Sequence, residues 1–302
     1  MINRLKTILG VENVLENEKL NNHTTFRVGG ASKALLTVNS VEELKTVLAA
    51  LKSAGENFFL LGNGSNLLVS DSGYDGYVIR LLGAFEDLRA EGKSVVAGSG
   101  AMLSKVCRFA RDNDLAGLEF AFGIPGTVGG AMVMNAGAYG GEMKDVVKSV
   151  ELMDFDGNLY NLSCEEMNFG YRDSIIKHKD YIVLKTVFEL NEGIKEEITA
   201  KMDEVMQKRR DKQPLEHPSA GSTFKRPEGA FAGKLIQDSG LAGARIGGAS
   251  VSTKHCGFIV NDMGGTATDI DRLMKLVADK VKNDSGFVLV PEVIRVGCFE
   301  QQ

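Results

Sequence analysis

The chain has 302 residues, of which 43% are hydrophobic and 25% are charged, and its formal net charge is −5. This composition is typical of a soluble globular enzyme with two or three modules. The acidic balance disfavours a general nucleic-acid-binding protein, and the absence of tryptophan disfavours a base-stacking platform.

No apolar run approaches the ~18 residues that span a bilayer, and residues 1–20 lack a signal-peptide core. The histidines and cysteines are scattered, which favours reduced cytosolic thiols over disulfides or a metal site. We therefore expect a cytoplasmic protein without a metal. The scattered residues are His23, His178, His217, His255, Cys107, Cys164, Cys256 and Cys298.

The N-terminal half is expected to mix helices with clustered strands. Residues 1–17 are interpreted as a helix, and Ser40 with Glu43 forms a capping box that begins a second helix. Further strands are predicted at 58–61, 67–69, 77–81 and 94–97, with a helix at 102–113.

The C-terminal half begins with predicted strands at 146–154, 159–162 and 181–190, the first two joined by an Asp156–Asn158 hairpin turn. A charged helix at 196–212 marks the expected module boundary. Beyond it we predict a helix at 230–239, a strand at 257–261, a helix at 268–283 capped by Thr268 and Asp271, and strands at 287–290 and 291–296. This uneven order predicts an α+β fold.

Two glycine-rich segments are candidate ligand-binding loops. Residues 117–140 contain seven glycines and a single charged side chain, Glu119, so backbone N–H groups could converge on a phosphate. Buried packing is an equally good interpretation of this segment alone. The second segment, Gly62-Asn-Gly-Ser-Asn66, precedes a strand rather than a helix, so it is no dinucleotide fingerprint and by itself favours a polar turn. Together the two loops suit a long diphosphate ligand.

Four other stretches contain candidate chemistry beside an ordinary structural explanation. Arg172 could orient an acidic substrate or form a surface salt bridge with Asp173. Ser222 could donate a proton or lie in a polar loop, and Glu292 could be a desolvated acid or face water on an edge strand. The cations from Arg209 to Lys212 could bind phosphate or stabilise a helix C-terminus.

In this order, these motifs resemble the UDP-N-acetylenolpyruvylglucosamine reductase family over nearly the whole chain. The stretches that carry the resemblance are TTFRVGG (24–30), LGNGSNLLVSD (61–71), GIPGTVGGAMVMNAGAYG (123–140), YRDS (171–174), AGSTFKRP (220–227), GG...KHCGFIVN (247–261) and VPEVIRVG (290–297). The resemblance implies an FAD-binding module of the vanillyl-alcohol-oxidase (PCMH) type and a C-terminal α+β substrate-binding module.

The implied activity is NADPH-dependent reduction of the enolpyruvyl ether to UDP-N-acetylmuramate for peptidoglycan. FAD N5 would give hydride to the vinyl carbon, and Ser222 would give the proton to the α-carbon. Arg172 and Glu292 would stabilise the enolate, as a growing charge requires. We expect non-covalent FAD, because residues 60–70 contain neither histidine nor cysteine. The protein is expected to bind its UDP-sugar and NADPH as a monomer.

The resemblance also implies the binding residues and the domains. Expected FAD contacts are Gly62, Asn63, Gly64, Ser65, Asn66, Gly123, Ile124, Pro125, Gly126, Thr127, Gly129, Gly130, Asn135, Ala136, Gly137 and Arg209. Expected substrate contacts are Lys212, Lys225, Arg226 and His255. The expected domains are an N-terminal helix (1–21), an FAD-binding domain (22–192) and a substrate domain (193–302), whose last strand (about 291–302) could return to the N-terminal module.

Two departures from the longer form of the family bear on nucleotide binding. The tyrosine loop expected after YRDS is absent, which indicates the compact form, and Arg226 stands where the longer form has asparagine. Two rival functions remain: a flavin-dependent oxidase or dehydrogenase of the same fold, and a nucleotide-sugar-binding protein without catalysis.

Overall fold

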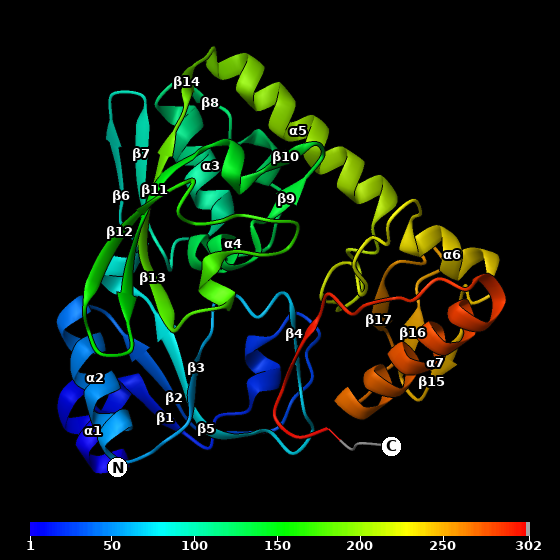
Figure 1. Ribbon diagram of the computed structural model, residues 1–302, viewed down its shortest axis with the longest axis horizontal. Helices are drawn as coiled ribbons and strands as arrows, with labels where there is room; N and C mark the ends of the chain where they lie inside the picture. The colour runs from blue at the N-terminus through cyan, green and yellow to red at the C-terminus, as the bar shows by residue number, and fades with distance from the viewer. Residues whose placement is uncertain (300–302) are drawn as a thin grey trace. The chain divides into compact units, whose positions relative to one another are not determined.

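The chain is divided between two compact units that are interleaved in the sequence. The computed structural model describes residues 1–299. Unit 1 comprises Met1–Glu16, Ala34–Asn63 and Gly76–Lys208, and unit 2 comprises Asn17–Lys33, Gly64–Asp75 and the chain from Arg209 onward. Both contain helices and strands (Figure 1), so the fold class is α+β. The domain limits expected from the sequence stay a prediction.

Helix α2 begins where its local sequence signal places it. In α2 the Ser40 hydroxyl accepts a hydrogen bond from the Glu43 N–H at 3.2 Å, which confirms the predicted N-cap. Leu44, Val47, Leu48 and Leu51 form the buried stripe of this helix. The helices of the described chain are α1 (Ile2–Leu9), α2 (Val41–Ser53), α3 (Leu103–Asp112), α4 (Val128–Met134), α5 (Lys195–Lys212), α6 (Ala232–Asp238) and α7 (Ala267–Ser285).

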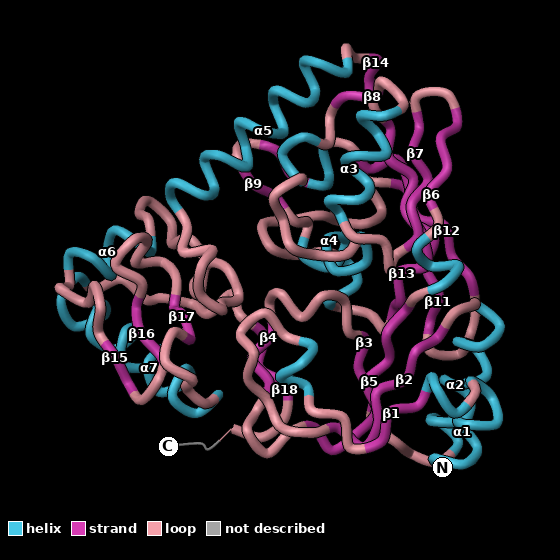
Figure 2. Tube along the Cα trace, turned by 180° about the vertical axis from the view of Figure 1, so that it is seen from behind, coloured by secondary structure: helices cyan, strands magenta, loops and turns pink. Residues whose placement is uncertain are grey.

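Unit 1 is built around a five-stranded antiparallel sheet with the order β12-β11-β13-β7-β6. These five strands run side by side in Figure 2. A second sheet has the order β1-β2-β5-β3, and β8–β14 and β9–β10 form two-stranded ladders. The strands are β1 (Val14–Glu16), β2 (Ser32–Val38), β3 (Phe58–Leu60), β5 (Tyr74–Leu81), β6 (Leu88–Glu91), β7 (Ser94–Gly98), β8 (Leu115–Ala116), β9 (Gly137–Ala138), β10 (Gly141–Glu142), β11 (Val147–Asp154), β12 (Leu159–Ser163), β13 (Tyr181–Glu189) and β14 (Asn191–Glu192).

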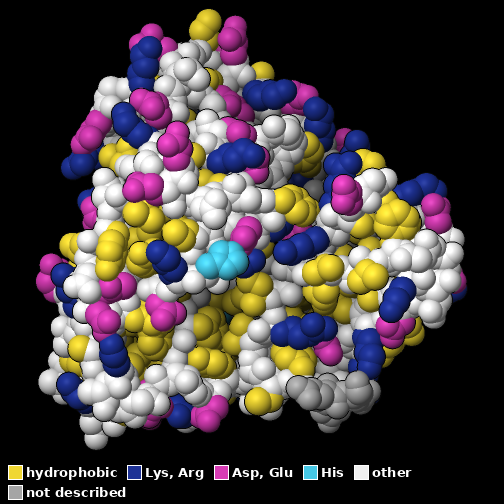
Figure 3. Space-filling view, viewed as in Figure 1, with side chains coloured by type: hydrophobic (Ala, Val, Ile, Leu, Met, Phe, Trp, Pro, Cys, Tyr) yellow, Lys and Arg dark blue, Asp and Glu magenta, His cyan; other side chains and the backbone are white. Residues whose placement is uncertain are grey.

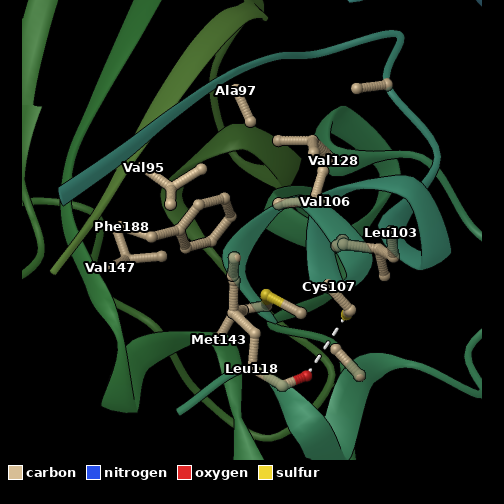
Figure 4. Close-up of a cluster of buried hydrophobic side chains, with 14 of the residues drawn as sticks. Val95, Ala97, Leu103, Val106, Cys107, Leu118, Val128, Met143, Val147 and Phe188 are labelled. Carbon is tan, nitrogen blue, oxygen red and sulfur yellow. Dashed lines mark hydrogen bonds between the residues drawn. The ribbon is translucent and has the colours of Figure 1, made fainter. Parts of the chain in front are cut away.

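Helices α3 and α4 pack on the five-stranded sheet through one hydrophobic cluster. Phe188 of β13 lies fully buried among Val95, Val106 and Val147 (Figure 4), and burying such a side chain contributes about 2 kcal/mol. The Cys107 thiol in this cluster donates to the Leu118 carbonyl at 3.2 Å. Burial raises the pKa of Cys107 to about 12, so this thiol is a core residue and not a nucleophile.

Unit 2 has a small antiparallel sheet with the order β15-β16-β17, which α7 contacts. Helix α7 begins with a capping box of Thr266 and Asp269, and Asp71 accepts from the N–H groups of Ala267 and Thr268, both at 2.8 Å. In addition, β18 pairs in parallel with β4. The strands are β4 (Leu67–Val69), β15 (Arg245–Ile246), β16 (Ala249–Val251), β17 (Ile259–Asn261) and β18 (Ile294–Val296).

Three sequence interpretations of local structure are wrong. The N-terminal helix ends at Leu9, and the chain then forms a 3-10 turn and β1. The cap of α7 is Thr266 rather than Thr268, because the reciprocal partner is Asp269. Residues 287–290 are not a strand, and Val288 is 61% exposed. The capping error shifts the helix start by one residue, to Ala267.

The molecular surface has mixed charge on the face seen in Figure 3, where acidic and basic side chains are interspersed. This distribution suits the modest net charge of −5. Among residues 1–299, no helix combines the length and the apolar character needed to cross a membrane.

Candidate functional site

A pocket in unit 1 is lined by parts of both glycine-rich segments. It has a volume of about 190 Å³, and Gly62, Asn63, Thr127, Gly129 and Gly130 contribute to its wall. The rest of the wall is provided mainly by β3, β5, β13 and the residues around Ser99. Predicted loop residues that are distant in sequence are therefore brought together at one cavity.

The two segments touch each other directly at this pocket. The Asn63 side-chain amide donates to the Pro125 carbonyl at 2.8 Å. A Cβ atom on Gly62 would lie 2.7 Å from Thr127 Oγ1, so only glycine fits without a shift. Within the described part of the chain, the N–H groups of Gly62 and Asn63 donate to no protein acceptor. These two donors are available to a ligand.

The central segment differs from the backbone cradle expected from its sequence. Residues 128–134 form helix α4, whose N-cap Thr127 accepts from the Gly130 N–H at 3.3 Å. The N–H groups of Val128 and Gly129 donate to the carbonyls of Ala101 and Ser99 at 2.9 and 2.8 Å. They anchor the segment to the fold and are not free for a phosphate. Sequence reasoning missed Ser99, Gly100 and Met102 as pocket residues, although the run of small residues from Gly98 to Ala101 was a usable signal.

The remainder of the first loop belongs to unit 2. Gly64 has a φ of 61°, and a Cβ atom there would lie 2.1 Å from the His23 carbonyl oxygen, which explains the glycine. The Asn66 side-chain amide donates to the carbonyl of Glu292 at 3.1 Å, and the Asn66 carbonyl accepts from the Ile294 N–H at 2.9 Å. A residue expected to bind FAD thus supports the backbone of a predicted catalytic residue.

Arg172 lies in unit 1, in a tight turn closed by two hydrogen bonds between Gly170 and Asp173. Its guanidinium donates to the carbonyl of Gly137 at 3.4 Å. The Asp173 carboxylate accepts a hydrogen bond from His178 Nε2 at 2.8 Å, and it lies 3.9 Å from the Lys177 ammonium. The hydrogen bond from His178 lowers the pKa of Asp173. Two other basic side chains therefore surround Asp173.

Ser222 and Glu292 lie on neighbouring segments of unit 2. The Glu292 N–H donates to the Thr223 carbonyl at 2.9 Å, and the Lys225 N–H donates to the Val290 carbonyl at 2.8 Å. On the other side, the Thr223 N–H donates to the Gly257 carbonyl at 2.9 Å. The structure thus brings the serine, the glutamate and the region of His255 together within one unit.

The predicted substrate contacts of unit 2 differ in their surroundings. His255 is partly buried and its Nδ1 accepts from the Gly257 N–H at 3.1 Å, while burial lowers its pKa. This favours the neutral ring with the proton on Nε2, which can donate to a ligand. The Arg226 guanidinium stacks 4.0 Å from the centre of the Phe231 ring. Lys225 is half-buried and Lys212 is exposed.

Arg209, the expected FAD contact at the end of α5, donates from Nε to the Gln213 side chain at 2.8 Å. The nearby Lys254 ammonium donates to the Arg210 carbonyl at 2.7 Å, so the C-terminus of α5 is tied to the segment that contains His255. Cations at this helix end also stabilise the helix dipole.

Comparison with known proteins identifies the family. A chain from Caldanaerobacter subterraneus subsp. tengcongensis, named UDP-N-acetylenolpyruvoylglucosamine reductase, is 48% identical over 297 residues, which is 98% of each chain. This chain belongs to that family. The reductase of the same name from Clostridioides difficile is 47% identical over 293 residues, covering 97% of this chain and 96% of that one.

Domain matches and a solved structure agree with membership of the reductase family. Residues 213–296 match the family described as the C-terminal domain of UDP-N-acetylenolpyruvoylglucosamine reductase, and residues 32–163 match an FAD binding domain. The crystal structure of the reductase from Thermus caldophilus has a TM-score of 0.82 and 39% identity, covering 94% of this chain and 99% of that one. The protein is an FAD-containing oxidoreductase, as the sequence resemblance predicts.

Proposed function

We propose that this protein reduces UDP-N-acetylenolpyruvoylglucosamine to UDP-N-acetylmuramate with NADPH, in the cytoplasm, as a step of peptidoglycan precursor synthesis. The observation that carries the proposal is the 48% identity over 98% of the chain to a reductase of that name. The unit 1 pocket bounded by both glycine-rich segments supports it. We further propose that the protein works as a monomer.

The residues around the pocket fit non-covalent FAD. Gly62 and Asn63 offer backbone N–H groups at the wall, and Gly130 leaves space where another residue would place a side chain. We propose that these residues hold the cofactor together with Arg209 and the other predicted contacts of the 62–66 and 123–137 segments, except Asn135, whose side chain binds protein groups. When bound, FAD supplies the hydride that reaches the vinyl carbon of the substrate.

Ser222 is proposed to deliver the proton to the α-carbon of the substrate. A serine hydroxyl is a weak acid, but it can protonate a strongly basic carbanion, and Lys225 follows three residues later in the same segment. Glu292 and Arg172 are proposed to stabilise the charge that grows on the substrate carboxylate. The Thr223–Glu292 hydrogen bond at 2.9 Å supports the pairing of the serine and glutamate segments.

The nucleotide part of the substrate is proposed to contact Lys212, Lys225, Arg226 and His255. Three of these are cations suited to a diphosphate. His255 with Nδ1 accepting from Gly257 would act as a neutral hydrogen-bond donor through Nε2. The stacked Arg226 guanidinium adds a planar face beside the aromatic ring of Phe231.

A steady-state assay with the purified holoenzyme tests this function against its rivals. We expect NADPH oxidation that requires the enolpyruvyl substrate and yields one UDP-N-acetylmuramate per NADPH. Turnover of an alcohol with oxygen would favour the oxidase alternative. Tight binding of a nucleotide sugar with no NADPH oxidation would favour the non-catalytic alternative, and either outcome would overturn the proposal.

A further inference from the structure

Asn135 ends helix α4 in a buried and unusual position. It is 1% exposed and adopts the left-handed conformation, with φ 41° and ψ 55°. Its Nδ2 donates to the Glu142 carboxylate at 2.7 Å and to the Gly170 carbonyl at 3.0 Å. Its Oδ1 accepts from the Lys144 N–H at 3.0 Å. Both amide protons and the amide oxygen therefore bind protein groups, so the side chain serves the fold around it.

The Gly170 contact matters because Gly170 begins the turn that carries Arg172. The N–H groups of Gly170 and Asp173 each donate to the carbonyl of the other, at 3.0 and 3.3 Å. Arg172 has a φ of 56° inside this turn, a conformation that costs on the order of 1 kcal/mol or more for a residue with a side chain. Such a turn keeps its shape only when its surroundings hold it.

Two further contacts connect the same turn with the end of α4. Ser174, which is fully buried, donates from its hydroxyl to the Val133 carbonyl at 3.0 Å. The Arg172 guanidinium donates to the Gly137 carbonyl at 3.4 Å, two residues after Asn135. Asn135 thus lies at the centre of a small hydrogen-bonded frame around the arginine.

We propose that Asn135 is a positioning residue that fixes the Gly170–Asp173 turn and thereby aims the Arg172 guanidinium. The inference rests on the proposed function, in which Arg172 binds the substrate carboxylate. The sequence predicts that Asn135 contacts FAD. We propose this different role because its side-chain amide is already hydrogen-bonded to Glu142, Lys144 and Gly170. A displacement of about 1 Å in a positioned group can cost about 100-fold in rate.

The test is Asn135→Gly, since glycine accepts the left-handed backbone but removes all three side-chain hydrogen bonds. Asn168→Gly is the matched control, because Asn168 is also left-handed, with φ 48°, yet exposed. Rapid-mixing absorbance measures the two half-reactions separately. We expect NADPH to reduce the flavin of Asn135→Gly within about twofold of the wild-type rate, while re-oxidation by the enolpyruvyl substrate slows about 10- to 100-fold. Asn168→Gly should match wild type in both.

A double-mutant cycle with Arg172→Ala separates this proposal from the proposed function. If Asn135 acts through Arg172, adding Asn135→Gly to Arg172→Ala slows re-oxidation by no more than about twofold. The positioning role would be overturned if the fold-reductions in re-oxidation rate multiply in the double variant, or if Asn135→Gly is re-oxidised at the wild-type rate. Either result would leave the proposed role of Arg172 unchanged. Wild-type re-oxidation by Arg172→Ala would remove Arg172 from the proposed function and overturn the positioning role with it.

Ser174→Ala provides a second variant in case Asn135→Gly fails to retain flavin. It removes only the hydroxyl bond to Val133 and leaves the Asn135 contacts intact. We expect slower re-oxidation by about 3- to 10-fold with unchanged flavin reduction, as for partial loss of an oriented group. Wild-type rates of Ser174→Ala in both half-reactions would contradict the proposal that these hydrogen bonds position Arg172.

Discussion

At the scale of single residues, Thr223 holds the proposed proton donor in place. It is fully buried, and its N–H, carbonyl and hydroxyl bind Gly257, Glu292 and Ile259, each at 2.9 Å. The backbone immediately after Ser222 is therefore fixed from two sides, while the Ser222 side chain itself remains partly exposed. A fixed backbone with an accessible hydroxyl is the arrangement that an oriented proton donor needs.

In contrast to Thr223, the buried Thr186 has a hydroxyl without a hydrogen-bond partner in the described part of the chain, which leads to a stability prediction. Thr186 lies fully buried on β13. An unsatisfied buried hydroxyl costs on the order of 1 kcal/mol or more, so Thr186→Val should raise the free energy of unfolding by about 1 kcal/mol. Urea unfolding followed by circular dichroism measures this change.

Thr199→Val is the matched control, because the exposed Thr199 hydroxyl donates to the Lys195 carbonyl at 2.7 Å. Its free energy of unfolding should change by less than about 0.5 kcal/mol. A loss of stability in Thr186→Val would show that the Thr186 hydroxyl has a partner, such as a bound water.

At the scale of elements, the β11–β12 hairpin depends on Asp154. Its carboxylate accepts from the N–H groups of Asp156 and Asn158, and from the side chains of Asn158 and Tyr160, all at 2.9 Å. These bonds, led by the Asn158 side chain, lower the pKa of Asp154 to about 2. Because the folded pKa lies below the unfolded value of about 3.9, the stabilisation is present above about pH 3.9 and is lost as the pH falls towards 2.

We therefore expect Asp154→Asn to unfold at a lower urea concentration than wild type at pH 6, and this gap to narrow at pH 3. Urea midpoints at the two pH values measure the difference. Asp203→Asn, on the exposed face of α5, is the control and should show a constant gap. A gap of equal size at both pH values for Asp154→Asn would contradict the role of this carboxylate.

Elements with short-range signals could be predicted from the sequence, whereas α4 could not. The Ser40 cap and the Asp156–Asn158 turn need only neighbouring residues, and both are present. Helix α4 contains Gly129 and Gly130, each of which disfavours a helix by about 1 kcal/mol. Burial of Val128, Ala131 and Met132 in the unit 1 core overrides that preference, and no local pattern reports such tertiary packing.

The strand predicted at residues 287–290 is not formed, because local apolar character alone does not make a strand. Their apolar side chains favour a strand, yet Leu289 is buried while Val288 and Val290 are 61% and 51% exposed. A strand needs a ladder partner, and β-propensity carries no information about one. The candidate site shows the same limit: its residues could be named from motifs, but the Asn135–Gly170 and Asn66–Glu292 contacts join residues 35 and 226 positions apart.

At the scale of the whole molecule, the chain passes repeatedly between the two units, and each unit contributes residues to the proposed reaction. The pocket lined by Gly62 and Thr127 and the Arg172 turn belong to unit 1. Ser222 and Glu292 belong to unit 2. We therefore expect substitutions of Ser222 or Glu292 in unit 2 to leave the reduction of the flavin by NADPH intact.

The central claim is that Ser222 is needed only in the second half-reaction, in which the enolpyruvyl substrate re-oxidises the flavin that NADPH has reduced. The most direct test is an anaerobic flavin spectrum of wild type and Ser222→Ala, recorded after NADPH and again after the enolpyruvyl substrate. We predict that NADPH bleaches the flavin in both proteins, that the substrate restores the colour of wild type, and that restoration in Ser222→Ala is at least about 100-fold slower. A wild-type flavin that the substrate fails to re-oxidise, or equal re-oxidation rates in the two proteins, would contradict the account.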